Sequence, residues 1–267
     1  MSTPVSSWPL AAFLTSLPLD FADAVKQAAD LGFTHVEVVA ETDRPASHLE
    51  GLADSGVVVV CASLGRGLPE GHTLDAADAQ VRRTTLSLVE RQISDAARLG
   101  ATAAYIVPGT QADETSLTYF AESCTLLAAF AAGRMVQLCL EHVPGRTLPT
   151  AAATLEFLQC LAHPNLALLL DVGHCLISGE NIADVVRRAN PRLGHIHLDD
   201  NDGVGDLHWP LLTGRLTDRH LRDLFAALQT ANYGGALSLE LKPGHADPVS
   251  ALQQSKRVVE QAAGWSN

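Results

Sequence analysis

Several kinds of residue and signal are scarce in this sequence, and each scarcity excludes a class of protein. Lysines and arginines number 18 against 30 aspartates and glutamates, which gives a net charge of −12. A protein that tracks the nucleic-acid backbone needs a basic face, so we expect no nucleic-acid partner. No apolar run approaches the length of a membrane span, so we expect no membrane partner either.

Signals for secretion and for disulfide chemistry are also missing. Residues 1–10 hold no charged segment followed by an apolar one, so no secretory signal is visible. The cysteines are odd in number, form no C-x-x-C pair and lie mostly in apolar segments: Cys61, Cys124, Cys139, Cys160 and Cys175. This usage predicts buried, reduced thiols in a cytoplasmic protein rather than disulfides or a thiolate metal site.

What the chain does have is a regular alternation of strand-like and helix-like segments. With 267 residues, 47% of them hydrophobic, it has the size and apolar content of one large α/β domain. No Pro/Ser-rich linker, charge block or low-complexity stretch interrupts it, so we predict one domain over residues 1–267. The expected strands are Leu10–Leu14, His35–Ala40, Val57–Ala62, Ala103–Val107, Val136–Leu140, Leu166–Leu170, Gly194–Leu198 and Ala236–Leu241. The expected helices include Asp20–Leu31, Leu74–Leu99, Leu117–Ala132, Thr150–Leu161, Ile182–Ala189, Asp218–Thr230 and Pro248–Ala263.

The number of strand–helix units indicates the architecture. Eight units joined by parallel crossovers favour a closed (β/α)8 barrel, the TIM barrel, whereas six or seven would have suited a doubly wound sheet. Two helices should stop sharply at Gly32 and Gly100, because glycine readily adopts the left-handed conformation that ends a helix.

The last four expected strands share an ionisable residue at the end of an apolar run: Glu141, Asp171, His197 and Glu240. Such a group is costly to bury unless it is paired or binds a metal. In a parallel barrel the carboxyl ends of all strands meet at one mouth, where active sites are found, so the four side chains should converge. Three carboxylates and one imidazole suit Mn²⁺ or Mg²⁺ and tolerate Co²⁺ or Zn²⁺. The alternative is that each residue merely caps a helix or faces solvent.

More polar residues follow these strand ends. His174 lies three residues after Asp171, at the start of a short helix. The longest connection, Asp199–Thr217, carries Asp206, His208, Trp209 and Arg215. Loops of this length are usually functional or disordered, so we expect this one to cover a substrate, with a solvated polar loop as the alternative.

These motifs together resemble the xylose isomerase-like TIM-barrel superfamily. The resemblance rests on Gly32–Val38, Leu140–Glu141, Leu170–His174, His195–Asp200, Gly205–His208 and Leu239–Lys242. That group includes the sugar phosphate isomerase/epimerase family, ketose 3-epimerases, hydroxypyruvate isomerase, inosose dehydratase and endonuclease IV. The motifs are specific for the superfamily and poor at naming a substrate.

The resemblance implies roles for individual residues. The metal ligands would be Glu141, Asp171, His197 and Glu240, and the two glutamates would also be the catalytic acid/base pair. The substrate contacts would come from Glu37, His174, His208 and Arg215. The set His174, Asp206 and His208 resembles the ligands of one of the three metals of endonuclease IV, so a second metal is conceivable. The ends of the third and fourth strands lack the histidines that those DNA-repair enzymes place there, which argues against DNA repair.

The resemblance therefore implies a divalent-metal-dependent isomerase or epimerase of a small sugar, a polyol-derived ketone or a hydroxy-keto acid. Proton transfer would pass through an enediolate held by the metal. The alternatives are a dehydratase or other lyase of the same fold, an endonuclease IV-like phosphodiesterase and a non-catalytic sugar-binding barrel. No glycine-rich phosphate loop follows the last two strands, which favours a non-phosphorylated substrate. Assembly into a homo-oligomer is left open by the sequence.

Residues beside the motifs have mostly structural interpretations. We expect His195 to be a packed, hydrogen-bonded barrel histidine and His142 to face away from Glu141. Lys242 should pair either with the substrate or with a neighbouring carboxylate. The segment Gly65–His72 is either a mobile lid or a plain glycine-rich loop.

Overall fold

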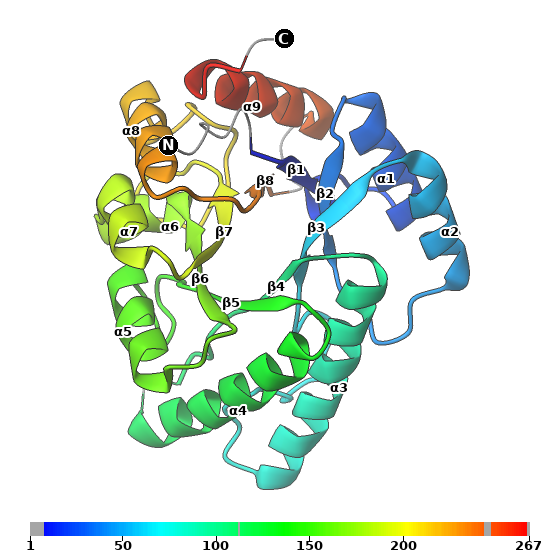
Figure 1. Cartoon of the computed structure of the whole chain (residues 1–267), viewed down its shortest axis with the longest axis vertical. Coiled ribbons are helices and arrows are strands. Elements are labelled where there is room, and N and C mark those ends of the chain that lie inside the picture. Colours follow the sequence, from blue (N-terminus) through cyan, green and yellow to red (C-terminus); the bar gives the residue numbers. More distant parts are fainter. Residues whose placement is uncertain (1–7, 112, 243–246, 266–267) are drawn as a thin grey trace.

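The structure is a computed structural model that describes residues 8–111, 113–242 and 247–265. Eight parallel strands close into a barrel in the order of the sequence, β1 to β8, and helices surround it (Figure 1). The strands are β1 (Leu10–Phe13), β2 (His35–Val39), β3 (Val58–Ser63), β4 (Ala103–Ile106), β5 (Gln137–Glu141), β6 (Leu166–Asp171), β7 (Leu193–Leu198) and β8 (Leu237–Leu239). The predicted (β/α)8 barrel is confirmed, and each expected strand is present with its ends shifted by two residues or fewer.

The helices follow the strands in alternation. They are η1 (Leu14–Ser16), α1 (Phe21–Asp30), α2 (Ala46–Ser55), α3 (Ala79–Arg98), α4 (Glu114–Ala132), α5 (Ala151–Leu161), α6 (Val172–Ser178), α7 (Ile182–Ala189), α8 (Asp218–Thr230) and α9 (Pro248–Ala262). The helix α2 was not among the expected ones, because it buries only Leu52 and has no side-chain cap, so its sequence shows little helical pattern. None of the helices in the described ranges is long and apolar enough to cross a membrane.

The start of α3 corrects one expectation. The helix was expected from Leu74, but the Asp78 side chain caps its first turn by accepting from the backbone N–H groups of Gln80 and Val81. Because an N-cap residue has extended backbone, it ends the preceding loop rather than continuing a helix. Residues Leu74 to Ala77 therefore belong to the β3–α3 loop at the carboxyl end of the barrel.

Two apolar clusters hold the barrel together. The larger one packs strands against helices, and the smaller one consists of Ala11, Val60, Cys61, Ala103, Tyr105, Cys139, Ala167, Leu169 and Ala236, which fill the barrel interior. Four of the cysteines are buried and all five are free, as expected, but Cys160 on α5 is exposed, so the expectation of burial is wrong for that residue. Its position on a surface helix explains the difference, since an apolar neighbourhood in sequence includes both faces of a helix.

The helix stops confirm the glycine signals. Gly32 and Gly100 have φ of +76° and +82°, and each donates its backbone N–H to a carbonyl of the preceding helix.

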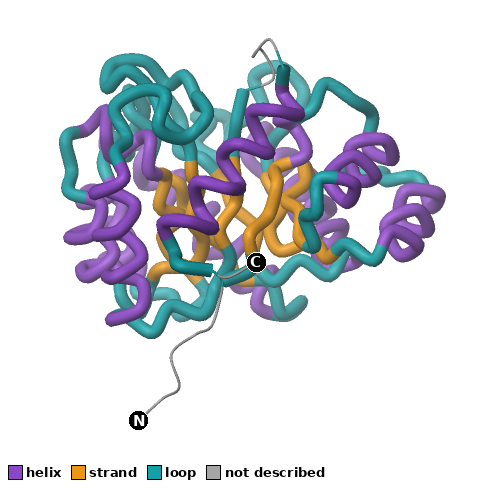
Figure 2. The backbone as a smooth tube through the Cα atoms, turned by 90° about the horizontal axis from the view of Figure 1, so that it is seen from above, coloured by secondary structure: helices purple, strands orange, loops and turns teal. Residues whose placement is uncertain are grey.

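The long β7–α8 loop is held together by the side chain of Asp200, which is fully buried. Its carboxylate accepts from the backbone N–H groups of Gly214 and Leu216. Figure 2 shows the strands inside a layer of helices, with loops gathered above and below them.

Candidate active site

The four residues predicted as metal ligands converge at the carboxyl ends of β5, β6, β7 and β8. One ligand atom from each of Glu141, Asp171, His197 and Glu240 lies within 4.8 Å of the others, and all four side chains are buried. The Nδ1 atom of His197 lies 2.7 Å from Glu240 Oε2, 3.5 Å from Glu141 Oε1 and 3.8 Å from Asp171 Oδ2. Neighbouring ligands of an octahedral Mg²⁺-sized ion lie about 3 Å apart, so this spacing fits one divalent cation.

The charges of the cluster also favour the binding of a cation. Asp171 Oδ2 is buried and makes no hydrogen bond with any residue of the described ranges. Three carboxylates crowd one imidazole here, and buried charges of one sign are costly unless something neutralises them. The donor set, oxygen-rich with one nitrogen, is the kind that Mn²⁺ and Mg²⁺ take. The residues present therefore fit a divalent metal.

The pKa values of the cluster show how strongly its charges interact. Burial, together with the nearby Asp199 carboxylate, raises the pKa of Asp171 to about 7. Burial also raises the pKa of Glu141 above its ordinary value. For Glu240 burial acts in the same direction, but the positive charge of His197 outweighs it and lowers the pKa to about 2. The two glutamates are thus pushed apart in acidity, as an acid and a base of one pair should be.

Glu37 does not lie where the sequence analysis placed it. It was expected to line the substrate pocket, but it is fully buried below the cluster, where its carboxylate accepts from Nε2 of His197 at 3.1 Å. Its other oxygen lies 2.9 Å from Nε2 of His195. Such a carboxylate fixes the tautomer of the histidine that it contacts, so the Nδ1 lone pair of His197 would be left for a metal ion. His195 also lies 2.8 Å from Ser238 Oγ, which confirms that it is a packed, hydrogen-bonded barrel histidine.

The second predicted cluster also comes together. One ligand atom from each of His174, Asp206 and His208 lies within 4.8 Å of the others. The Nε2 atoms of His174 and His208 lie 3.2 and 2.7 Å from the same Asp206 oxygen. Burial would lower the pKa of His174, but Asp171 and the Asp206 hydrogen bond outweigh it and raise the pKa to about 10.

The Nδ1 atoms of His174 and His208 contact supporting groups on the side of each ring away from Asp206. His174 Nδ1 donates to the backbone carbonyl of His142 at 2.6 Å, and His208 Nδ1 lies 3.1 Å from Asp199 Oδ2. The His142 ring is buried and its Nε2 accepts from the backbone N–H of Asp171. His142 therefore supports the site without lining the pocket, in keeping with the expected opposite orientation.

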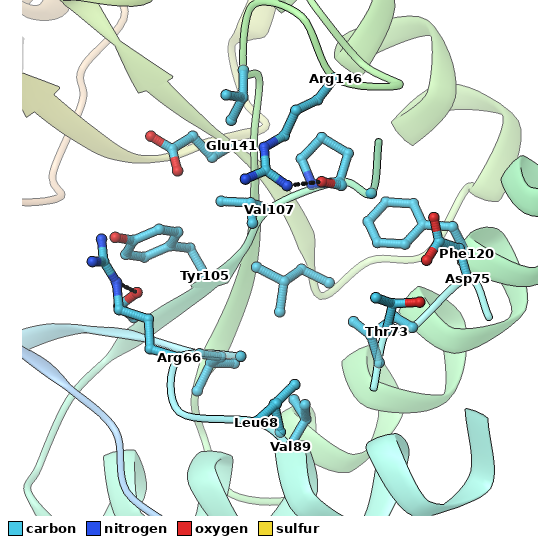
Figure 3. Close-up of a pocket in the computed structure, with 18 of the residues that line it drawn as sticks. Arg66, Leu68, Thr73, Asp75, Val89, Tyr105, Val107, Phe120, Glu141 and Arg146 are labelled. Atoms are coloured by element: carbon cyan, nitrogen blue, oxygen red, sulfur yellow. Dashed lines mark hydrogen bonds between the residues drawn. The ribbon is translucent and has the colours of Figure 1, made fainter. Parts of the chain in front are cut away.

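A pocket of about 460 Å³ opens over these two clusters. Its walls come mainly from the loops that follow β3, β4, β5 and β7. Its polar and aromatic lining includes Arg66, Asp75, Tyr105, Phe120, Glu141, Arg146, His174, Asp206, His208 and Glu240. Figure 3 shows Glu141, Tyr105, Arg66 and Arg146 around one part of it. The β7–α8 loop thus reaches the pocket through Asp206 and His208, although Trp209 does not line it.

The arginine of the pocket is not the one that was expected. Arg215 is exposed and lies outside the pocket lining, because its backbone N–H donates to Asn201 and its side chain packs beside Gly203. Arg66 and Arg146 line the pocket instead. Arg66 places Nη2 3.4 Å from Glu240 Oε1 and its guanidinium over the Phe13 ring, 5.4 Å from the ring centroid.

The sequence held only weak signals for these residues. Arg66 lies in the glycine-rich segment Gly65–His72, which was singled out as a lid or a loop, whereas Arg146 and Asp75 carried no signal. Lys242 lies 3.6 Å from Asp206 Oδ2, so it pairs with a neighbouring carboxylate, one of its two expected roles.

Curated relatives of the chain have several activities. D-psicose 3-epimerase of Enterocloster bolteae is 28% identical over 107 residues, which cover 39% of this chain and 36% of that protein. The 2-oxo-tetronate isomerase of Pectobacterium atrosepticum is 23% identical over 251 residues, 88% of this chain and 90% of that protein. Inosose dehydratase of Yersinia enterocolitica is 24% identical over 172 residues, 57% of each chain. The match to D-psicose 3-epimerase thus spans little more than a third of that protein's length.

Solved structures share the fold. D-psicose 3-epimerase in the presence of D-fructose superposes with a TM-score of 0.79 at 21% identity, covering 96% of this chain and 99% of that one. D-allulose 3-epimerase from Methylomonas sp. gives 0.82 at 20% identity, covering 98% and 100%. An AP endonuclease of family 2 from Brucella melitensis gives 0.77 at 20% identity, covering 92% and 97%.

The family itself is shown by its sequence profile. The family described as "Xylose isomerase-like TIM barrel" matches residues 25–265. The relatives include isomerases and epimerases, which supports an enzyme of that class, as the sequence analysis expected. The chain belongs to the xylose isomerase-like TIM barrel family.

Proposed function

We propose that the protein is a divalent-metal-dependent isomerase or epimerase of a small sugar, a polyol-derived ketone or a hydroxy-keto acid. The observation that carries the proposal is the pair of buried carboxylates, Glu141 and Glu240, which line one pocket beside a cluster fit for a divalent cation. The pKa of Glu141 is raised and that of Glu240 is lowered, which suits an acid and a base that work as a pair.

The metal and the protein have separate tasks in this proposal. Mn²⁺ or Mg²⁺, with Co²⁺ or Zn²⁺ as alternatives, would be held by Glu141, Asp171, His197 and Glu240. When bound, it stabilises the negative charge that develops when a proton leaves the carbon beside a carbonyl. One of the two glutamates removes that proton, and the other returns a proton to the same or the neighbouring carbon. His174 and His208, which line the pocket, hold substrate oxygens, while Arg66 keeps Glu240 in place.

Solvent deuterium exchange tests this function. The EDTA-treated protein is reloaded with Mn²⁺, Mg²⁺ or Co²⁺ and incubated in D₂O with ketoses and hydroxy-keto acids. We expect metal-dependent incorporation of deuterium beside the carbonyl, together with an isomer of unchanged heavy-atom mass. Exchange that persists in rigorously metal-free protein would refute the metal-dependent mechanism. The absence of exchange with every compound at saturating metal would favour a non-catalytic sugar-binding barrel.

A lyase of the same fold is the second candidate, and the matches to inosose dehydratases favour it. Such an enzyme begins with the same proton abstraction but then expels a hydroxyl group. Product mass separates the two, because a loss of one water indicates a dehydratase. A phosphodiesterase is less well supported, since the last residues of β3 and β4 are Ser63 and Ile106 rather than histidines.

As an alternative to their role as substrate contacts, we propose that His174 and His208 hold a second metal together with Asp206. Counting the metals bound per chain in the wild type and in Asp206→Asn tests it. A loss of one metal equivalent in the variant supports the site, and an unchanged count of one contradicts it. Cytoplasmic location and the absence of nucleic-acid and membrane partners stay predictions, and homo-oligomeric assembly stays an open question.

A further inference from the structure

One side chain in the pocket has no role in the chemistry described above. Asp75 lies on the β3–α3 loop, lines the pocket and is 7% exposed. It forms no hydrogen bond or ion pair with another residue in the described parts of the chain. In the view of Figure 3 it lies with Phe120 on the side of the pocket opposite Glu141. Most of the residue is covered, but its carboxylate faces the pocket, so both oxygens are available to accept hydrogen bonds from a molecule bound there.

The loops around Asp75 hold its carboxylate in place. The preceding residue, Leu74, is buried, and its carbonyl accepts from Ser123 Oγ on α4 at 2.7 Å. Across the pocket wall lies Gly109, where an added Cβ would come within 1.8 Å of Asp75 Oδ2. The Gly109 carbonyl accepts from both the backbone N–H and the Oγ1 of Thr147, at 3.0 and 2.9 Å. The space for the carboxylate therefore exists because position 109 has no side chain and its backbone is tied down.

The surroundings of Asp75 define the chemistry of its partner. A carboxylate only accepts hydrogen bonds, so the partner must donate them. Arg146, which donates to the carbonyl of Pro108 at 3.1 Å, lines the same pocket and offers donors on another part of its wall. Phe120 adds an apolar face. An acceptor, a donor and an aromatic ring together suit a carbon chain that carries hydroxyl groups, whereas an anionic group at this place would meet the charge of Asp75.

We propose that Asp75 is a specificity-determining residue that binds hydroxyl groups at the end of the substrate farther from the reacting carbonyl. The substrate is then a neutral, polyhydroxylated ketose of more than three carbons, and an analogue with a phosphate at its far end is disfavoured. This inference rests on the proposed function, since it presumes that the carbonyl end of the substrate lies at the metal-ligand cluster.

Binding and exchange are measured separately to test it. NMR titrations of the Mg²⁺-loaded protein give dissociation constants for D-fructose, for D-fructose 6-phosphate and for dihydroxyacetone, which lacks the distal hydroxyls. Asp75→Ala should raise the dissociation constant of D-fructose by about tenfold or more, equal to about 1.4 kcal/mol. It should leave the dissociation constant of dihydroxyacetone within about twofold of the wild-type value. Wild type should bind D-fructose more tightly than its 6-phosphate, and Asp75→Asn should narrow that preference.

A second variant approaches the same carboxylate from the other side. Gly109→Ala has no left-handed backbone to oppose it and leaves Asp75 intact, but its methyl group displaces the carboxylate. It should reproduce the selective loss for D-fructose, which separates a local effect from misfolding of the Asp75 variant.

Each result bears on the inference. The subsite would be refuted if Asp75→Ala weakened the binding of both neutral ligands equally or left D-fructose binding unchanged. It would also be refuted if the wild type bound D-fructose 6-phosphate more tightly than D-fructose, or did not bind D-fructose at all. Deuterium exchange tells this apart from the proposed function. Exchange without dependence of binding on Asp75 refutes the subsite alone, whereas Asp75-dependent binding without exchange refutes the proposed catalysis and leaves the subsite standing.

Discussion

His197 divides its two ring nitrogens between the carboxylate below it and the ligand cluster above it. Nε2 donates to Glu37, and Nδ1 faces the oxygens of Glu141, Asp171 and Glu240. A supporting carboxylate of this kind raises the basicity of the histidine and orients the ring, and its loss typically costs 10–100-fold in metal affinity.

We therefore expect Glu37→Gln to weaken Mn²⁺ binding by roughly 10–100-fold, measured by isothermal titration. Once the metal is saturating, the KM of the variant should stay near the wild-type value, because Glu37 lies outside the pocket lining. Ser238→Ala is the matched control, since Ser238 contacts His195 rather than His197. A raised KM with unchanged metal affinity would instead restore Glu37 as a substrate contact.

Glu240→Gln tests the acid/base pair. The amide keeps the size of the side chain but cannot accept or deliver the proton at neutral pH, so we expect kcat to fall by about 10²–10⁴-fold. Metal content is measured in parallel, because Glu240 also belongs to the ligand cluster. Arg215→Gln serves as the control outside the pocket and should leave kcat/KM within about twofold. Near-wild-type turnover of Glu240→Gln with metal retained would contradict the assignment.

At the scale of elements, α3 is fastened to the loop after β2 by a buried ion pair. Arg44 Nε lies 2.9 Å from Asp95 Oδ2, and both side chains are nearly inaccessible to solvent. Asp95 also accepts from the backbone N–H of Glu41 and from Arg98. Removal of the Asp95 charge leaves Arg44 buried with only the partly exposed Glu41 carboxylate beside it, which is far more costly than the loss of an exposed pair.

Asp95→Asn should accordingly lower the free energy of unfolding by about 3 kcal/mol or more, measured by urea denaturation. Arg91→Gln is the matched control on the same helix, because Arg91 pairs with Asp43 on the surface. We expect it to change stability by less than about 0.5 kcal/mol. Equal effects of the two variants would show that the Arg44–Asp95 pair does not fasten the loop.

At the scale of the whole molecule, the cluster of Glu141, Asp171, His197 and Glu240 should couple folding to metal and pH. Burial raises the pKa of Asp171 from 3.8 to about 7 in the folded protein. The contribution of this group to stability is therefore complete below about pH 4 and is lost as pH rises through about 7. A bound divalent cation neutralises the carboxylate and stabilises the folded state that binds it.

Saturating Mn²⁺ should therefore raise the melting temperature, and the increase should be larger at pH 8 than at pH 6. Differential scanning calorimetry with and without EDTA measures both increments, and Asp171→Asn should reduce the dependence on pH. The reverse order, with a larger increment at pH 6, would show that Asp171 does not govern this coupling.

The alternation of short apolar runs with helical segments, read from the sequence, was enough to predict the barrel and seven of its helices. The polar residues at the strand ends could also be predicted from the sequence. Glu141, Asp171, His197 and Glu240 each follow a buried run, and a parallel barrel brings the carboxyl ends of its strands to one mouth whatever the loops do. The helix α2 was missed because a helix that buries one residue leaves almost no periodic pattern.

Only the tertiary structure decided which layer along the barrel axis each inward-facing side chain occupies. Glu37 pairs in register with Phe13 and Cys61, while His197 pairs with Asp171 and Ser238. Because the stagger between strands sets which layer a residue occupies, Glu37 lies below the ligands rather than in the pocket. Position within a single strand does not contain that information.

The side chains of the loops also depended partly on the sequence and partly on the tertiary structure. The sequence determined by itself which chemistry gathers at the barrel mouth, since local runs and their polar ends suffice for it. It could not determine that Arg66, Arg146 and Asp75 face the pocket while Arg215 faces away. Those directions come from bonds between distant segments, such as Ser123 to Leu74 and Thr147 to Gly109, which exist only once the barrel has closed.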